Sequence, residues 1–103
     1  MGRFVKAIET AELSPGEGKQ VDIEGLSIAV FNIEGNLYAI EGNCSHRGGL
    51  LGEGEVEGEV VTCPLHGAQF NVKTGKVLTL PAGSDMRRYT VKVEGGDVLI
   101  ELD

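Results

Sequence analysis

The sequence predicts an all-β protein, an antiparallel sandwich or barrel. Glycine supplies 16 of the 103 residues, more than twice the usual share, which is typical of a chain with many tight turns. Polar and apolar residues alternate in segments such as 20–24 and 88–94, with the period of a half-buried strand. No segment carries the longer apolar periodicity of an amphipathic helix. Short strands joined by turns are therefore expected throughout.

The strands follow from local pattern. Segment 26–33 (LSIAVFNI) is apolar on both faces apart from Ser27 and Asn32, which predicts a central strand. Glu34-Gly35-Asn36 has the chemistry of a hairpin turn. A brief helical turn is expected over residues 9–13, before Ser14-Pro15-Gly16. The remaining expected strands are residues 4–8, 20–24, 37–40, 60–62, 69–72, 76–80, 88–94 and 97–101.

Acidic residues occupy every second position from Glu53 to Glu59. In an extended chain these four carboxylates would share one face. We expect a solvated edge that discourages aggregation, with a docking surface for a basic protein partner as the alternative.

Both cysteines and both histidines of the chain fall in two short pairs, Cys44-Ser45-His46 and Cys63-Pro64-Leu65-His66. Thiolates and neutral imidazoles suit zinc or iron, so these four residues can hold one tetrahedral metal or a two-iron cluster. Zinc fingers usually place both cysteines in one pair and both histidines in the other, which is not the order here. A disulfide between Cys44 and Cys63 is a further alternative, but it leaves the adjacent histidines unexplained.

The two pairs carry a resemblance. Together with Arg47-Gly48-Gly49, Gly67, Phe70, Thr74-Gly75 and Leu80-Pro81-Ala82, they resemble the Rieske-type [2Fe-2S] ferredoxins over nearly the whole chain. The pattern is most similar to the ferredoxin components of bacterial ring-hydroxylating dioxygenase systems. In that family each loop supplies one cysteine and one histidine, so the resemblance implies one [2Fe-2S] cluster per chain, held by Cys44, His46, Cys63 and His66.

The resemblance also implies an organisation and a role. The chain would be one Rieske domain, residues 1–103, with a base from residues 1–41 and 84–103 and an inserted cluster-binding subdomain from residues 42–83. It would not be an enzyme but a monomeric one-electron carrier between a flavin-dependent reductase and a terminal oxygenase. High-potential relatives carry hydroxyl side chains where this chain has Ala68 and Phe70, so we expect a potential at the low end of the Rieske range, about −150 mV.

Charge and composition exclude other roles. The formal net charge is −7, which repels nucleic acid and anionic membranes and favours basic protein partners. Residues 1–6 lack the apolar run of a signal peptide, and no 18 consecutive apolar residues occur. A soluble, cytoplasmic protein is therefore expected.

Two other functions remain open. One is the small Rieske-like subunit of a nitrite-reductase-type complex, although such subunits often lack the metal ligands that are present here. The other is an interaction module stabilised by zinc. No constellation of catalytic side chains occurs outside the two Cys/His pairs.

Overall fold

The computed structural model describes residues 3–42, 50–64, 67–78 and 86–102, and the regular secondary structure of these ranges consists of strands that pair antiparallel and two short 3-10 helices. The elements are β1 (Arg3–Glu9), the 3-10 helix η1 (Thr10–Glu12), β2 (Gly18–Ile23), β3 (Leu26–Ile33), β4 (Asn36–Glu41), the 3-10 helix η2 (Leu51–Glu53), β5 (Glu55–Glu57), β6 (Val60–Thr62), β7 (Gln69–Asn71), β8 (Arg88–Tyr89), β9 (Val91–Glu94) and β10 (Asp97–Leu102). The all-β prediction is confirmed.

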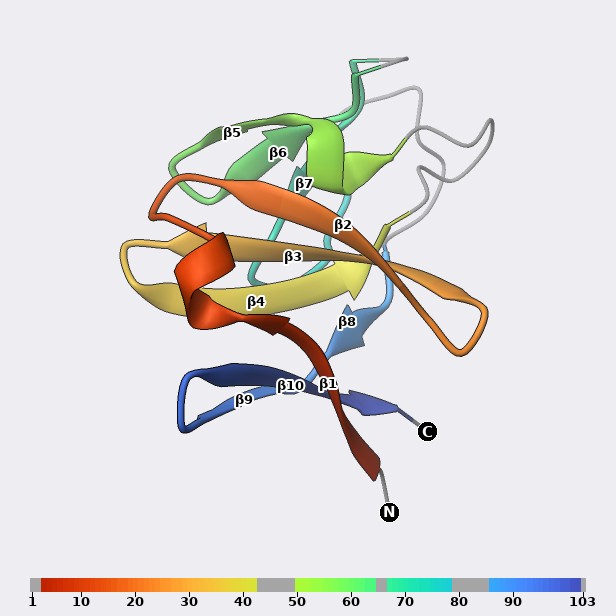
Figure 1. Cartoon of the computed structure of the whole chain (residues 1–103). Coiled ribbons are helices and arrows are strands. Elements are labelled where there is room, and N and C mark those ends of the chain that lie inside the picture. The colour runs from red at the N-terminus through yellow and green to blue at the C-terminus, as the bar shows by residue number, and fades with distance from the viewer. Residues whose placement is uncertain (1–2, 43–49, 65–66, 79–85, 103) are drawn as a thin grey trace.

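The strands form three sheets, with the orders β1-β10-β9, β2-β3-β4-β8 and β5-β6-β7. Figure 1 shows them as layers, with the β2-β3-β4 strands in the middle, β5 to β7 above, and β9 and β10 below. Both chain ends lie on the lower side, away from β5 to β7. The middle sheet therefore has a neighbour on each face.

Two hydrophobic cores occupy the spaces on either side of the middle sheet. We call one the base core: Ile8, Leu13, Ile23, Ile28, Val30, Ala39, Tyr89, Val98, Ile100 and Leu102. We call the other the loop-side core: Ala29, Phe31, Ile33, Ile40, Leu51, Val61, Cys63, Ala68, Phe70, Val72 and Met86. Successive residues of a strand point to opposite faces, so β3 contributes alternately to both cores. This confirms the prediction of a central strand from residues 26–33.

The two polar residues of β3 have specific partners. Asn32 is buried, donates from Nδ2 to the Leu13 carbonyl at 2.9 Å, and accepts at Oδ1 from the Gly35 amide at 2.8 Å. Ser27 accepts a hydrogen bond at Oγ from the side chain of Gln20. These hydrogen bonds give partners to the Asn32 amide and the Ser27 hydroxyl, which would lower stability if they were buried without partners.

The expected hairpin between β3 and β4 is present. Glu34 and Gly35 both have positive φ, 55° and 92°, which matches the twist of a tight two-residue hairpin loop. The expected helical turn is also present, as η1. There the Glu12 side chain accepts a hydrogen bond from the Glu9 backbone amide at 2.9 Å and so satisfies the start of the turn.

Three sequence predictions were wrong in detail. The acidic stretch is not one extended face, because Glu53 ends η2 and Glu59 lies in the turn between β5 and β6. Residues 76–78 form no strand and contribute one isolated bridge, between Val77 and Phe70; residues 79–80 lie outside the described ranges. The expected strand 88–94 is divided at Thr90, where the chain passes from the middle sheet to the sheet of β10. The last of these departures depends on a partner strand that is distant in sequence, because β8 pairs with β4.

Candidate functional site

Cys63 directly follows β6, and its side chain is almost completely buried, with 1% exposed. Its backbone amide donates to the Ala68 carbonyl at 2.8 Å, and its carbonyl accepts from the Gly67 amide at 3.0 Å. Gly67 has a φ of 74°, a conformation that side-chain-bearing residues rarely adopt. Two backbone hydrogen bonds therefore join the two ends of the connection between β6 and β7. Cys44, His46 and His66 lie outside the described residues.

The segment that contains Cys44 and His46 has both of its ends fixed. The Gly42 amide donates to the Ser27 carbonyl at 2.8 Å, and the Leu51 amide donates to the Gly42 carbonyl at the same distance. Gly42 immediately follows β4, and Leu51 begins η2. The chain therefore enters η2 beside the point where it leaves β4.

The segment that contains Pro81 is also anchored on both sides. Leu78 donates from its amide to the Gln69 carbonyl at 2.8 Å, and Met86 donates to the Gly75 carbonyl at 2.6 Å. Pro81 itself lies outside the described residues, so its expected role as a cover over the metal centre stays a prediction.

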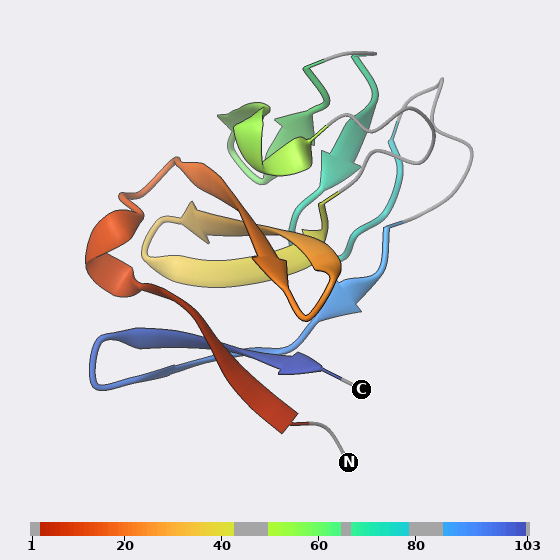
Figure 2. The ribbon, with the colours of Figure 1, turned by 45° about the vertical axis from the view of Figure 1, so that its right-hand side comes forward.

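These three sets of ends are neighbours. The Glu41 amide, beside the first segment, donates to the carbonyl of Arg87, beside the third, at 2.8 Å. β5, which follows η2, pairs with β6 through Glu55 and Thr62, just before Cys63. Figure 2 shows the described chain ends on the upper right of the molecule, away from both termini. The topology thus brings together the starting points of the segments that carry all four predicted ligands.

The surroundings of Cys63 are apolar. It packs in the loop-side core with fully buried Leu51, Val61 and Phe70. Ala68 and Phe70, the positions where high-potential relatives carry hydroxyl groups, are both completely buried and offer no side-chain hydrogen-bond donor.

The donor chemistry fits the group that the resemblance implies. Cys63 would supply a soft sulfur ligand from a buried position, beside a turn held by two backbone hydrogen bonds. A buried, apolar position of this kind favours a metal centre of small total charge, which the predicted set of two thiolates and two neutral imidazoles would provide.

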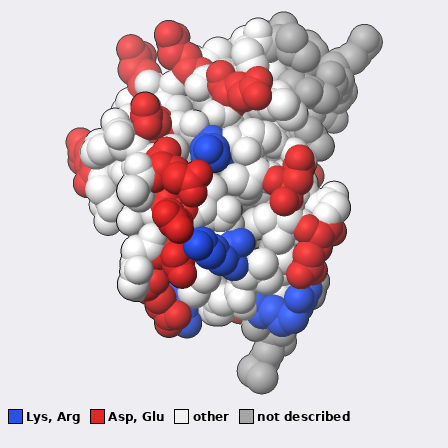
Figure 3. Space-filling model, viewed as in Figure 1, with Lys and Arg blue, Asp and Glu red and all other residues white. Residues whose placement is uncertain are grey.

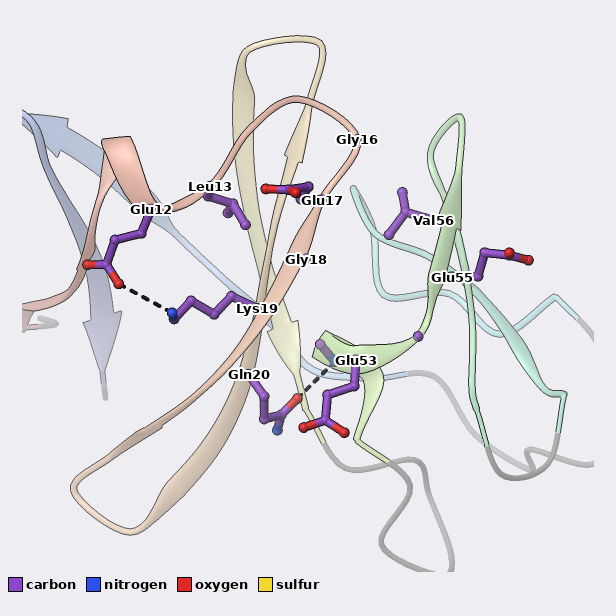
Figure 4. Close-up of a pocket in the computed structure, with 12 residues that line it drawn as sticks. Glu12, Leu13, Gly16, Glu17, Gly18, Lys19, Gln20, Glu53, Glu55 and Val56 are labelled. Atoms are coloured by element: carbon purple, nitrogen blue, oxygen red, sulfur yellow. Dashed lines mark hydrogen bonds and ion pairs between the residues drawn. The ribbon is translucent and has the colours of Figure 1, made fainter.

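An open groove lies beside the first anchored segment, between η1 and β2 on one side and η2 and β5 on the other (Figure 4). Glu12, Glu17, Glu53 and Glu55 line it, together with Lys19, which lies 3.3 Å from the Glu12 carboxylate. The hydrogen bond from the Glu9 amide, with a smaller contribution from Lys19, lowers the pKa of Glu12 below its ordinary value of 4.5. Figure 3 shows acidic side chains over much of this face. The Lys19–Glu12 ion pair is exposed, and the groove belongs to the solvated surface.

Sequence reasoning missed Gln20. In the sequence it is only a polar position of an alternating strand. In the structure its side-chain carbonyl accepts from the Gly52 amide at 2.8 Å, one residue after Leu51. No local signal could have shown this contact, because the two residues are 32 positions apart.

Comparisons with known proteins define the class. A model of the Rieske [2Fe-2S] domain matches residues 3–90. The 3-phenylpropionate/cinnamic acid dioxygenase ferredoxin subunit of Escherichia coli strain K12 is 43% identical over 99 residues, covering 95% of this chain and 92% of the relative. The ferredoxin in a structure of the complex of reduced oxygenase and oxidised ferredoxin of carbazole 1,9a-dioxygenase superposes with a TM-score of 0.88. It shows 31% identity and covers 95% of this chain and 92% of that one.

The fold also occurs in a different kind of complex. The structure of a protein described as a putative NADH-dependent nitrite reductase small subunit from Mycobacterium tuberculosis superposes with a TM-score of 0.86. It shows 22% identity and covers 100% of this chain and 97% of that one. At this identity the likeness extends to the fold alone.

The chain belongs to the Rieske [2Fe-2S] domain family. It is a ferredoxin-type electron carrier, a component of a multicomponent system and not its catalytic subunit, and it holds one [2Fe-2S] cluster. None of the helices in the described ranges has the length and apolar character that crossing a membrane requires.

Proposed function

We propose that this ferredoxin carries single electrons in the cytoplasm from a flavin-dependent reductase to the terminal oxygenase of a ring-hydroxylating dioxygenase-type system. The observation that carries the proposal is the 43% identity to a dioxygenase ferredoxin subunit over nearly the whole of both chains. The anchored segments around Cys63 support it, because they supply the rigid frame that a cluster in an electron carrier needs.

In this proposal Cys44 and Cys63 would hold one iron of the cluster, and His46 and His66 would hold the other. The support is the burial of Cys63 together with the adjacency of the described ends of the segments that contain the other three residues. The cluster supplies one-electron redox chemistry when bound, with histidine ligation raising its potential above that of all-cysteine ferredoxins.

The chain's own residues set the conditions for that chemistry. Cys63 lies in the loop-side core, where Leu51, Val61 and Phe70 exclude water from the sulfur. Ala68 and Phe70 offer no hydroxyl to the metal centre, and hydrogen bonds to sulfur are one of the means by which proteins raise such potentials. A midpoint near the low end of the Rieske range, about −150 mV, follows from this environment.

Residues 42–83 form the cluster-binding subdomain in this proposal, and residues 1–41 and 84–103 form the base. The separate β5-β6-β7 sheet supports the division. The loop-side core also takes side chains from β3 and β4, so the subdomain uses the base as the floor of its core.

The protein partners are the reductase and the oxygenase. The ferredoxin-oxygenase complex of carbazole 1,9a-dioxygenase, whose ferredoxin shares this fold, supports the second of these. The net charge of −7 favours association with basic protein surfaces and makes the association rate fall as salt is added.

Anaerobic redox titration followed by mixing with partner proteins tests the proposal. The protein should take up one electron per chain near −150 mV. The reduced form should then pass that electron to an oxidised terminal oxygenase of a dioxygenase system. A clearly positive midpoint would contradict the account of Ala68 and Phe70. Electron transfer only as a bound subunit of a nitrite reductase would favour the other complex that shares this fold.

A further inference from the structure

Gln20 connects β2 to both ends of the segment that contains Cys44 and His46. Its Oε1 accepts from the Gly52 amide at 2.8 Å, and its Nε2 donates to Ser27 Oγ. Figure 4 shows the Gln20 side chain extending from β2 toward η2, where the first of these hydrogen bonds is drawn. Gly52 lies just after the segment, and the Ser27 carbonyl holds the amide of Gly42 just before it.

The two glycines at these ends pack closely against Gln20. A Cβ added to Gly52 would lie 2.6 Å from Gln20 Cα, and one added to Gly42 would lie 2.8 Å from Gln20 Cδ. The backbone after the segment therefore packs directly on the β2 backbone, and the backbone before it packs on the Gln20 side chain. Movement of this side chain would displace both ends.

The primary amide is suited to this place because it acts at once as acceptor and donor. A glutamate would keep an acceptor for Gly52 but would lose the donor to Ser27, and a methionine of similar length would lose both. Gln20 is half-buried, so water does not fully replace the lost partners.

We propose that Gln20 is a positioning residue for the [2Fe-2S] cluster: it fixes the segment of Cys44 and His46 where that segment leaves β4 and where it enters η2. This inference rests on the proposed ligand set. It predicts that loss of the Gln20 amide loosens the hold on the cluster and alters its electronic environment, and that an equal loss of stability elsewhere does neither.

Gln20→Met in the cluster-loaded protein is the test, with Asn32→Leu as the matched control. Asn32 also makes two side-chain hydrogen bonds from the middle sheet, but to Leu13 and Gly35, which lie away from Gly42 and Gly52 in sequence. Three quantities are compared: the rate of cluster release to an iron chelator, followed by visible absorbance; the midpoint potential; and hydrogen exchange at the Gly52 amide.

Gln20→Met should release the cluster about tenfold faster than the wild type, a factor that corresponds to about 1.4 kcal/mol and is within the range expected for the loss of two hydrogen bonds. Its Gly52 amide should exchange faster, and its potential and reduced-state electron paramagnetic resonance spectrum should change. Asn32→Leu should lower the melting temperature and leave the release rate, potential and spectrum unchanged. Equal release rates in Gln20→Met and wild type, or equal acceleration by Asn32→Leu, would overturn the proposal.

Ser27→Ala keeps the proposal testable if Gln20→Met does not fold. It removes only the acceptor of Gln20 Nε2, so a smaller acceleration of cluster release is expected, and an unchanged rate together with an unchanged spectrum would overturn the inference. Failure of the ligand set has a different signature, since the wild type itself would then contain no inorganic sulfide.

Discussion

The two cores of this ferredoxin are built in different ways. The base core lies between sheets whose pairs are long: β1 with β10, and β2 with β3, each match six residue pairs. The loop-side core is covered by β5, β6 and β7, which have three residues each. We expect side-chain burial and strand pairing to stabilise the first core, and the second to depend in addition on the anchored segment ends, the close glycine contacts and the cluster.

This difference separates stability from redox function. Substitutions in the base core should lower the free energy of unfolding and leave the redox properties unchanged. Substitutions on the loop side should affect cluster retention beyond their effect on global stability. The following predictions test this separation, from the largest expected effect to the smallest.

Cys63→Ser should abolish cluster binding, because the buried sulfur that we propose as a ligand, directly after β6, is replaced by a hard oxygen donor. Hydrogen exchange should then show loss of protection in β6 and β7, while the amides of β10 remain protected. Iron content and exchange measured on one sample check both parts. Retention of two irons per chain would refute the role proposed for Cys63.

Ile100→Ala should lower the free energy of unfolding by about 2–5 kcal/mol, since it removes a completely buried side chain from the base core and leaves a cavity. Denaturant unfolding measures the loss. The midpoint potential of the folded protein should not change. A shifted midpoint potential would show that a change in the base core reaches the cluster, and would contradict the separation of stability from redox function.

Gly75→Ala should destabilise the loop side by more than the cost of backbone conformation alone. Gly75 has a φ of 79°, and a side chain there costs about 1–2 kcal/mol in strain. The added Cβ would also lie 3.1 Å from the Met86 carbonyl carbon.

Gly16→Ala is the control for Gly75→Ala. It has a similar φ of 87°, but nothing lies within 4 Å of the added Cβ, so it carries the conformational cost only. Denaturant midpoints compare the two variants. Equal losses would mean that the contact of Gly75 with Met86 has no energetic role.

One carboxylate in the base and one on the loop side should each make a small contribution to the fall in stability at acid pH. Hydrogen bonding from Arg3 lowers the pKa of Glu24 in the base, and hydrogen bonding from Asn71, with the charge of Lys73, lowers that of Glu59 on the loop side. A lowered carboxyl pKa gives stability that is present above the ordinary value of 4.5 and is lost as pH falls through the folded-state value.

Glu24→Gln and Glu59→Gln should each flatten the fall in melting temperature between pH 6 and pH 3 by a small amount. Glu59→Gln should in addition reduce the pH dependence of cluster release, because Glu59 joins the β5-β6 turn to Asn71 of β7 at 2.8 Å. If the rate of cluster release had the same pH profile in both variants, the proposed separation of stability from cluster retention would be contradicted.

Much of this architecture could be predicted from the sequence because it depends on local pattern. The apolar run 26–33 specified a strand buried on both faces, and Glu34-Gly35 specified its hairpin. The Cys/His pairs indicated the family without any knowledge of the fold. These features are determined by residues within a few positions of one another.

The rest could not be predicted because it depends on contacts between distant residues. The contact of Gln20 with Gly52 requires η2 to pack on β2, and the division of strand 88–94 at Thr90 requires two separate sheets to receive its halves. The acidic stretch was predicted to be continuous because its alternation is regular; the turn at Gly58 and the pairing of β5 with β6 interrupt it.

Chemical analysis of the purified protein tests the central claim most directly. Iron, acid-labile sulfide and zinc are measured per chain in one preparation. The account predicts two irons and two sulfides in each chain, as a [2Fe-2S] cluster held by Cys44, His46, Cys63 and His66 requires. A single zinc without sulfide would contradict it, and the protein would then be a β scaffold that carries no electron.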